Sequence, residues 1–399
     1  MKITKMNGLG SFGVWVDDFD FDSPEAWKEL EQINLKTLVT VVRNNKDVWK
    51  QVQQHWWLTC RVRTSSRTYF IRKYGDHWNS PGHWDHEDRI SQMNMSRVAV
   101  EDLPGGIARV TGKLDDYGHN IGMFTDTELR WHQNGSGVRT FAPCVQLYGK
   151  ENMLGSSTGF GVTADWLDEQ SESFRSELED LVAIHQWIPR MIQPTGLEEC
   201  EKHLRLSFSE VEPSEQPLVM TSPGGITGIH LGLGTLSGFK GMAQKEADNL
   251  IEHLTKELCD SKCTMDVWWP HDSGDLYLFD NTITMHNRSF RPGIDVKTAL
   301  EKRVGIRIAG DYPSKIYWRP SEMQPWAKNR DEWWPLDNYW GQVSERSYVN
   351  AMLNAISNDV ERNNMINLIR QNRPEILDFL AYSQEDLDQM LQTHLENSH

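Results

Sequence analysis

Residues 276–286 read Leu-Tyr-Leu-Phe-Asp-Asn-Thr-Ile-Thr-Met-His, and this stretch decides the fold that we expect. The run Leu276–Phe279 is apolar and rich in residues that favour strands. It ends at Asp280-Asn281, a pair that favours a turn. A second β-rich run then leads to His286. The stretch therefore predicts two short strands around a polar turn, with a histidine at the end of the second strand.

Other short runs along the chain have the composition of strands and are separated by Gly, Asp and Pro. They lie at Leu38–Val42, Met265–Trp269 and Arg303–Ile308. Helical patterns accompany them. They run from Ser23-Pro24 to about residue 32, along one apolar face from Thr163 to His185, and over Ala243–Leu258. Many short strands with a few helices packed outside predict a sandwich or a barrel.

The composition excludes several classes of protein. The formal net charge is -16 and no Lys/Arg-rich run interrupts it, so nucleic acid is not an expected partner. No stretch approaches the roughly 20 apolar residues that span a bilayer, and the N-terminus lacks the apolar core of a signal peptide. The five cysteines are scattered and lack zinc-type spacing. We expect a soluble cytoplasmic protein with reduced thiols and no membrane contact.

The chain divides into two parts by pattern. Residues 1–340 contain the strand-like runs and are expected to form one sheet-based domain. Residues 341–399 are polar and helical, with a break at Pro374, and are expected to form a C-terminal extension that docks or makes a homo-oligomer. Residues 75–130 are rich in Gly, Asp, His and Asn and predict long loops over a site.

A candidate metal site comes from two distant segments. Residues 131–135 read Trp-His-Gln-Asn-Gly. In a strand, residues two apart point to the same side, so His132 and Asn134 would present their side chains together, roughly 6 to 7 Å apart along the backbone. His286, far along the chain, would complete a three-residue face that leaves the opposite coordination positions open. Such an open face is what activation of oxygen requires.

A third segment, residues 303–307, supplies a positive charge. Arg303 and Arg307 alternate with aliphatic residues, so a strand here would bury its aliphatic face and turn both guanidiniums to the other side. A guanidinium fork matches a carboxylate through two parallel hydrogen bonds. One arginine would therefore suit the distal carboxylate of 2-oxoglutarate, and the other an acidic substrate.

The order of these motifs resembles the taurine dioxygenase-like (TauD/TfdA) family of iron(II)/2-oxoglutarate-dependent oxygenases. The resemblance runs over roughly residues 7–315 and rests on WHxN, a GxSTGF-like stretch before a helix ending at His185, FDNTITMH, RVGIR and AGDYP. It implies a mainly β fold with helices: a double-stranded β-helix (jelly roll, cupin-like) core with outer helices, followed by the helical C-terminal extension.

The resemblance also implies roles for single residues. His132 and His286 would be iron ligands, Thr158 would lie beside 2-oxoglutarate, and Arg303 would bind its distal carboxylate, although Ser156 or Ser157 are alternatives for the place of Thr158. Arg307 would lie near the acidic group of the substrate. Asp280 and Asn281 would support these residues.

One position departs from the family. The family carries a carboxylate two residues after the first histidine, where this chain has Asn134. A carboxamide oxygen can bind iron but lacks the negative charge, so metal affinity should fall. Alternatively, the pair Asn134-Gly135 deamidates to an aspartate, or Asp126 or Glu128 supplies the carboxylate. Glu128 is the more suited of these to contact a substrate amine.

We therefore expect an enzyme, a non-haem iron(II) dioxygenase that uses 2-oxoglutarate and O2. It would hydroxylate a small anionic or zwitterionic substrate and release succinate and carbon dioxide. Two alternatives remain at this point. One is a halogenase or desaturase on the same scaffold, and the other is a non-catalytic relative in which Asn134 marks a lost metal site and the barrel only binds a ligand.

Overall fold

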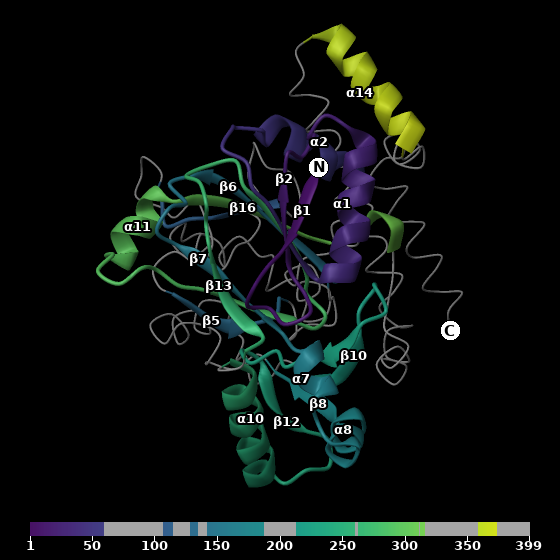
Figure 1. The fold of residues 1–399 in the computed structure, drawn as a ribbon, viewed down its shortest axis with the longest axis vertical. Coiled ribbons are helices and arrows are strands. Elements are labelled where there is room, and N and C mark those ends of the chain that lie inside the picture. The colour runs from purple at the N-terminus through teal and green to yellow at the C-terminus, as the bar shows by residue number, and fades with distance from the viewer. Residues whose placement is uncertain are drawn as a thin grey trace, which may run out of the picture.

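A computed structural model describes the chain at residues 1–59, 107–114, 128–134, 142–186, 213–259, 262–310, 312–315 and 358–372. Within these residues the strands gather into one large sheet, one four-stranded sheet and a smaller lobe with its own strands and helices (Figure 1). The chain thus has the mixed, sheet-rich character that its short strand-like runs predict.

The larger sheet has seven strands in the order β1-β2-β3-β14-β6-β16-β4. All neighbours pair antiparallel except β2 and β3, which are parallel. The strands are β1 (Lys2–Lys5), β2 (Val14–Asp17), β3 (Val39–Val42), β4 (Ile107–Val110), β6 (Cys144–Glu151), β14 (Leu276–Asp280) and β16 (Val304–Gly310).

The smaller sheet has four antiparallel strands in the order β13-β7-β15-β5. They are β5 (Leu129–His132), β7 (Ser157–Val162), β13 (Thr264–Trp268) and β15 (Thr284–Arg288). Strands β14 and β15 follow each other in sequence, and the turn between them carries the chain from the larger sheet to the smaller one. The stretch 276–286 thus connects the two sheets.

The inner faces of the two sheets enclose one apolar core. Phe279 of β14 and Phe160 of β7 are both fully buried, and their rings contact edge to face with centroids 5.1 Å apart. Val145 and Tyr277 from the larger sheet and Val267 from the smaller sheet belong to the same cluster. Because side chains alternate across a strand, this contact fixes which residues of each strand face the other sheet.

The outer face of the larger sheet is covered by helices. Strand β16 turns Val304, Ile306 and Ile308 outward, into a cluster with residues of α1 (Pro24–Thr37) and α2 (Trp49–Thr59). Ser23 caps α1 by accepting from the Ala26 N–H. Helix α14 (Asp359–Asn372) adds Ile369 to this cluster, and Figure 1 shows it beyond α2 at the top of the molecule.

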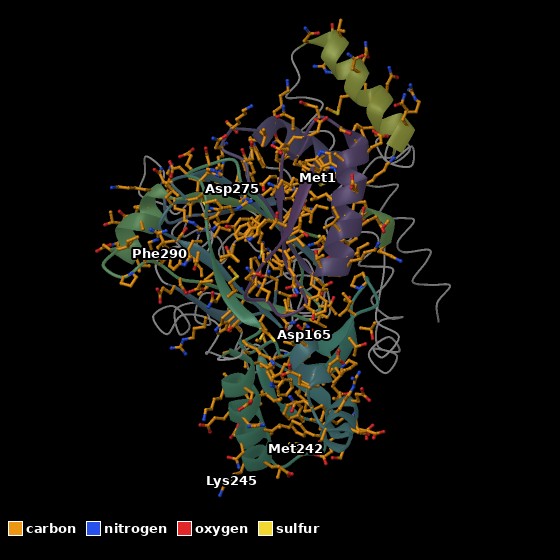
Figure 2. All side chains as sticks on the ribbon, viewed as in Figure 1. Met1, Asp165, Met242, Lys245, Asp275 and Phe290 are labelled. Atoms are coloured by element: carbon orange, nitrogen blue, oxygen red, sulfur yellow. The ribbon has the colours of Figure 1, made fainter. Side chains whose placement is uncertain are left out.

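A separate lobe covers the outer face of the smaller sheet. It holds α7 (Ala164–Asp168), α8 (Glu172–Glu179), β8 (Val182–His185), β9 (Ser214–Pro217), β10 (Val219–Thr221), β11 (Thr227–Ile229), β12 (Leu236–Phe239) and α10 (Gln244–Cys259). Its core includes Met285 of β15 and packs against Trp131 of β5. In Figure 2, Asp165 lies at the junction with the sheets, whereas Met242 and Lys245 lie at the far end of the lobe.

One predicted helix is wrong. The pattern from Thr163 to His185 suggested a continuous apolar helix face, but the structure divides it into α7, α8 and β8. Ser171 explains the division, because its side chain caps α8 by accepting from the Phe174 N–H and so starts a new helix. His185 consequently ends a strand and not a helix.

Other predictions hold or are not tested. The helices that begin at Pro24 and near Ala243 are confirmed as α1 and α10, with α1 longer than expected.

Strand β4 lies inside the stretch 75–130 that was expected to be loop, and most of that stretch lies outside the described residues. Of the C-terminal extension only α14 is described, so the boundary at residue 340 and the break at Pro374 remain predictions. Two short helices, α11 (Val296–Lys302) and the 3-10 turn Pro313–Lys315, complete the described elements.

Two further observations concern membranes and thiols. In the part of the chain that the structure describes, no helix is long and apolar enough to cross a bilayer. Of the five cysteines, Cys144, Cys259 and Cys263 are described, and these three form no disulfide.

Asn34 of α1 fastens this helix to the larger sheet. Its buried amide donates to Thr40 Oγ1 (3.1 Å) and to the Leu278 carbonyl (2.9 Å), and it accepts from the Tyr312 hydroxyl (2.8 Å). We expect Asn34→Ala to lower the free energy of unfolding by about 3 kcal/mol, because it leaves buried polar groups unpaired. Urea denaturation measures this, and the exposed Asn249→Ala should change stability by less than about 0.5 kcal/mol. Equal losses in the two variants would contradict the prediction.

Candidate active site

His132 and His286 meet on neighbouring strands of the smaller sheet. They are register partners in the β5–β15 pairing, so both side chains lie on the same face. That face is the inner one, because His286 also pairs with Phe160 of the central core. The two ring centroids are 4.1 Å apart. Two imidazoles that are distant in the sequence are thus brought together between the sheets, as the sequence predicted.

Both rings present a lone pair at Nε2. The Nδ1 atom of His132 lies 2.8 Å from the Arg130 carbonyl, an acceptor, so Nδ1 carries the proton and Nε2 does not. The Nε2 atom of His286 lies 3.1 Å from the amide nitrogen of Asn134, a donor, so this Nε2 is also an acceptor. Neutral imidazoles that can accept at Nε2 are the form that binds a metal, although in His286 this atom already accepts from Asn134.

Burial keeps both imidazoles neutral. Burial, with repulsion from the nearby Arg307 and Arg288 guanidiniums, lowers the pKa of His132 to about 4. Burial also holds the pKa of His286 well below its ordinary value, with added repulsion from His132 and Arg307. The rings therefore stay unprotonated near pH 7, and no proton has to leave before a metal binds.

Asn134 lies beside His286 but not on the strand. Strand β5 ends at His132, and Asn134 follows in a turn. Its side chain still reaches the site, with Nδ2 at 3.1 Å from His286 Nε2 and Oδ1 accepting from Arg307 Nη1 at 3.0 Å. The amide therefore turns its nitrogen, and not its oxygen, towards the histidine that we expect to bind iron.

The turn after β14 holds this segment in place. The Asn281 carboxamide accepts from the Asn134 N–H and donates to the Asn134 carbonyl, both at 2.8 Å. Gln133, buried, donates to the Thr282 carbonyl at 2.8 Å and accepts from the Gly232 N–H at 2.8 Å. Asp280 accepts from the N–H groups of its own turn, and burial raises its pKa to about 7. The support role expected of Asp280 and Asn281 matches these bonds.

Arg307 lies on the opposite sheet, and Arg303 directly precedes its strand β16. Arg307 is on β16 and pairs with Leu147, whose other partner Tyr277 belongs to the core between the sheets. Arg303 stands two residues before Gly305, at the end of α11, and a Cβ on that glycine would lie 3.8 Å from Nη2 of Arg303. Both guanidiniums are thus on the inner side, as their alternation with aliphatic residues predicted.

The Arg303 guanidinium is buried and has unused donors. Its exposed fraction is 3%, and its Nε and Nη1 have no hydrogen-bond partner among the described residues. Burial lowers its pKa to about 10, so it remains a cation at neutral pH. A buried cation with free donors is costly unless an anion pairs with it. This group therefore suits the distal carboxylate of 2-oxoglutarate.

Thr158 lies on the inner face of β7, and its neighbours do not. It is two residues before Phe160 on the same strand and is buried. Ser157 points to the other side, where its hydroxyl meets the Ser289 carbonyl, and Ser156 donates to the Met153 carbonyl. Of the three hydroxyls considered from the sequence, Thr158 is the one placed towards the core.

Of the two acids proposed as replacements for the carboxylate, Glu128 alone lies within the described residues. Glu128 is exposed at the start of β5, and its carboxylate accepts from the Phe290 N–H at 3.3 Å. Asp126 and Gly135 lie outside the described residues. Within the described ranges, no group of three or more His, Cys, Asp or Glu side chains is placed to hold a metal. The described residues at this place therefore offer two imidazoles and one carboxamide.

Sequence reasoning missed a third cation, Arg288. It follows His286 by two residues on β15, so it shares the inner face, and it is 3% exposed. Asn287 pairs with Gly159, which places Arg288 next to Thr158 at the end of the ladder. Its guanidinium lies 5.9 Å from the Phe290 ring centroid. Its parity with His286 on the same strand was a usable signal in the sequence.

The other histidines take structural roles or lie elsewhere. His185 and His230 are buried in the small lobe with ring centroids 5.6 Å apart, and their Nδ1 atoms meet Thr235 Oγ1 and the Thr282 carbonyl. His271 pairs with Asp275 at 2.8 Å. His83, His86 and His119 lie outside the described residues.

The arrangement is one in which imidazoles on one sheet face guanidiniums on the other, a class of site that combines a metal with an acidic cosubstrate. The comparison with known families agrees. The profile described as "Taurine catabolism dioxygenase TauD, TfdA family" matches residues 6–295, so the chain belongs to this family. The family consists of dioxygenases that use iron(II), 2-oxoglutarate and O2, and the protein is accordingly an oxidoreductase. Arg303 and Arg307 lie just beyond the matched residues.

Solved structures share the fold. Two from Burkholderia xenovorans, both described as taurine dioxygenases, have TM-scores of 0.51 and 0.50 with 16% sequence identity each. The alignments cover 78% of this chain in both cases, and 90% and 89% of the other chains. No curated protein matches the sequence significantly.

The buried histidine His230 should make stability depend on pH. Burial lowers its pKa to about 4, so between pH 7 and pH 5 the unfolded chain takes up a proton there and the folded chain does not. Stability is therefore lost as the pH falls, by about 2 kcal/mol for this group at pH 5. His230→Asn keeps a donor for the Thr282 carbonyl and should reduce the loss by that amount in urea titrations. The exposed His253→Asn controls for removal of a ring, and an unchanged loss in His230→Asn would contradict the prediction.

Proposed function

We propose that this protein is an iron(II)/2-oxoglutarate-dependent dioxygenase that hydroxylates a small anionic or zwitterionic molecule and releases succinate and carbon dioxide. The observation that carries the proposal is the pairing of His132 with His286 on the inner face of one sheet, opposite the buried Arg303 of the other. Membership in the TauD/TfdA family supports the class of reaction.

In this proposal the two facing sheets are the halves of a jelly-roll barrel. His132 and His286 would hold the iron through Nε2, and their low pKa values keep both rings unprotonated. The third protein ligand would be Asn134 through Oδ1. For this the amide must turn, because its nitrogen now faces His286. Turning breaks the bond from Arg307, a charge-assisted hydrogen bond that is worth roughly 1.5–3 kcal/mol.

Bound iron would supply the activation of O2 with the 2-oxo acid as electron donor. The chain's own residues position the reactants. Arg303 would bind the distal carboxylate of 2-oxoglutarate with its unused donors, and Thr158 would add a hydroxyl beside it. Phe160 and Phe279 line the core next to His286 and exclude water from that side.

The substrate class follows from the remaining charges. Arg307 keeps Nε without a hydrogen-bond partner among the described residues, and burial lowers its pKa to about 10, so it is a cation that can bind an acidic group. Glu128, at the exposed start of β5, would contact an amine. An acidic group with or without an amine is what these two residues would select.

One observation favours a second candidate, a relative that binds 2-oxoglutarate-like acids without catalysis. The Asn134 amide donates to His286 Nε2, the lone pair that iron needs. If this bond is stronger than the attraction of the metal, iron does not bind, but the arginines would still bind an acid. Metal binding decides between the two candidates.

The deciding experiment measures succinate formed from 2-oxoglutarate in the presence of iron(II) and O2, without added substrate. We expect slow uncoupled turnover by the wild type and at least about 100-fold less by His286→Ala, because a metal ligand is removed. Asn134→Asp should turn over faster than wild type, since a carboxylate can satisfy both Arg307 and iron. The exposed His253→Ala is the matched control and should behave as wild type.

The outcomes separate the two candidates. Succinate from none of the variants, together with retained binding of 2-oxoglutarate, would support the binding protein and overturn the enzyme. Turnover in His286→Ala equal to wild type would overturn the assignment of this histidine.

The Arg303 assignment has its own test. Arg303→Met removes the buried cation and should raise the KM for 2-oxoglutarate about 30-fold, because a charge-assisted pair with the distal carboxylate is lost. Arg175→Met removes a partly exposed arginine of α8 that forms surface ion pairs with Asp168 and Glu179, and it should leave this KM unchanged. An unchanged KM in Arg303→Met would show that the carboxylate binds elsewhere, with Arg288 as the next arginine to test.

A further inference from the structure

Three side chains form a hydrogen-bonded relay across the space between the sheets. Arg307 Nη1 donates to Asn134 Oδ1 at 3.0 Å, and Asn134 Nδ2 lies 3.1 Å from His286 Nε2. The relay starts at a guanidinium on β16 and ends at the imidazole on β15. Its middle member therefore connects a candidate anion site to a candidate metal ligand.

The guanidinium decides which way the amide points. A carboxamide has an acceptor end and a donor end, whereas a guanidinium can only donate. Arg307 therefore selects the orientation with Oδ1 towards itself, and the donor end is left for His286. In the turned orientation Nδ2 and Nη1 would be two donors facing each other. The main chain of Asn134 cannot relieve this, because Asn281 holds both its N–H and its carbonyl.

We propose that Arg307 is a positioning residue that couples the two sites: an anion bound to Arg307 releases Asn134, the amide turns, and the affinity for metal rises. The inference rests on the proposed metal site. An anion would take over the donors of Arg307 and would also accept from Nδ2 of the turned amide. Oδ1 then faces the metal, and the Nε2 atom of His286 loses its competing donor.

Arg307 has the capacity for this exchange. The residue is partly buried, and its Nε atom is buried and has no hydrogen-bond partner in the described part of the chain. This donor is therefore unused while the bond to Asn134 is still intact. By linkage, the metal must raise the affinity for the anion by the same factor as the anion raises the affinity for the metal. The acidic substrate would thereby complete the metal site that acts on it.

The test is a titration with Co(II), followed by visible absorption, which reports affinity and coordination and needs no turnover. Propionate is the anionic probe and propionamide its neutral counterpart, at constant ionic strength. In the wild type we expect propionate to tighten Co(II) binding about 10-fold, the equivalent of one released hydrogen bond. Propionamide should have no effect. The absence of a difference between the two probes would overturn the proposal.

Two variants separate coupling from direct ligation. Arg307→Met frees the amide, so it should bind Co(II) more tightly than wild type without any anion and should not respond to propionate. Asn134→Asp can satisfy Arg307 and the metal together, so it should also bind tightly and not respond. A propionate effect that persists in both variants would show that the anion binds the metal itself or Arg303, and would overturn the coupling. Thermal melts confirm that each variant is folded.

The same titration distinguishes this inference from the function on which it rests. His286→Ala should abolish the Co(II) spectrum. If the wild type binds no Co(II) with or without propionate, the metal site itself is wrong. If the wild type binds Co(II) and His286→Ala does not, but propionate has no effect, the coupling alone is wrong.

Discussion

The turn that joins β14 to β15 is the constraint on which the site depends. The Asp280 carboxylate accepts from the N–H groups of Thr282 and Ile283 and fixes the turn. Its two polar neighbours, Asn281 and Thr282, then hold the segment after β5 through Asn134 and Gln133. One tight turn thereby sets the passage from the larger sheet to the smaller sheet and also the position of Asn134 beside His286. The register pairing of β15 with β5 then places His286 beside His132.

The candidate site combines neutral imidazoles with buried cations, and this combination favours the entry of anions. Burial discourages a proton on His132 and His286, and the nearby guanidiniums discourage it further. Among the described residues, Arg303 and Arg307 keep donors that have no acceptor. Such an interior is most stable when anions enter it, because anions both pair with arginine and attract a metal to the imidazoles. An incoming anion thus neutralises the charge of the arginines and favours the binding of a metal at the histidines.

The sequence predicted the faces on which these residues lie because strands impose a simple rule. Alternation of side chains placed His286 and the two arginines on inner faces, and the same rule would have found Arg288. The rule does not apply beyond a strand end, which is why the contacts of Asn134 were not predictable from its spacing to His132. The helix expected from Thr163 to His185 failed for a related reason. Apolar spacing indicated a continuous face, but the cap at Ser171 restarted the helix, and His185 became part of a sheet.

An asparagine at position 134 is best understood through Arg307 and not through the metal alone. A carboxylate there would accept from Arg307 with one oxygen and leave the second oxygen for a metal. A carboxamide has only one acceptor atom, and the guanidinium already holds it. The substitution therefore changes more than one unit of charge, because it converts a residue that can serve two partners at once into one that must choose between them. Whether Arg307 binds Asn134 or an anion then determines whether the amide turns its nitrogen or its oxygen towards His286.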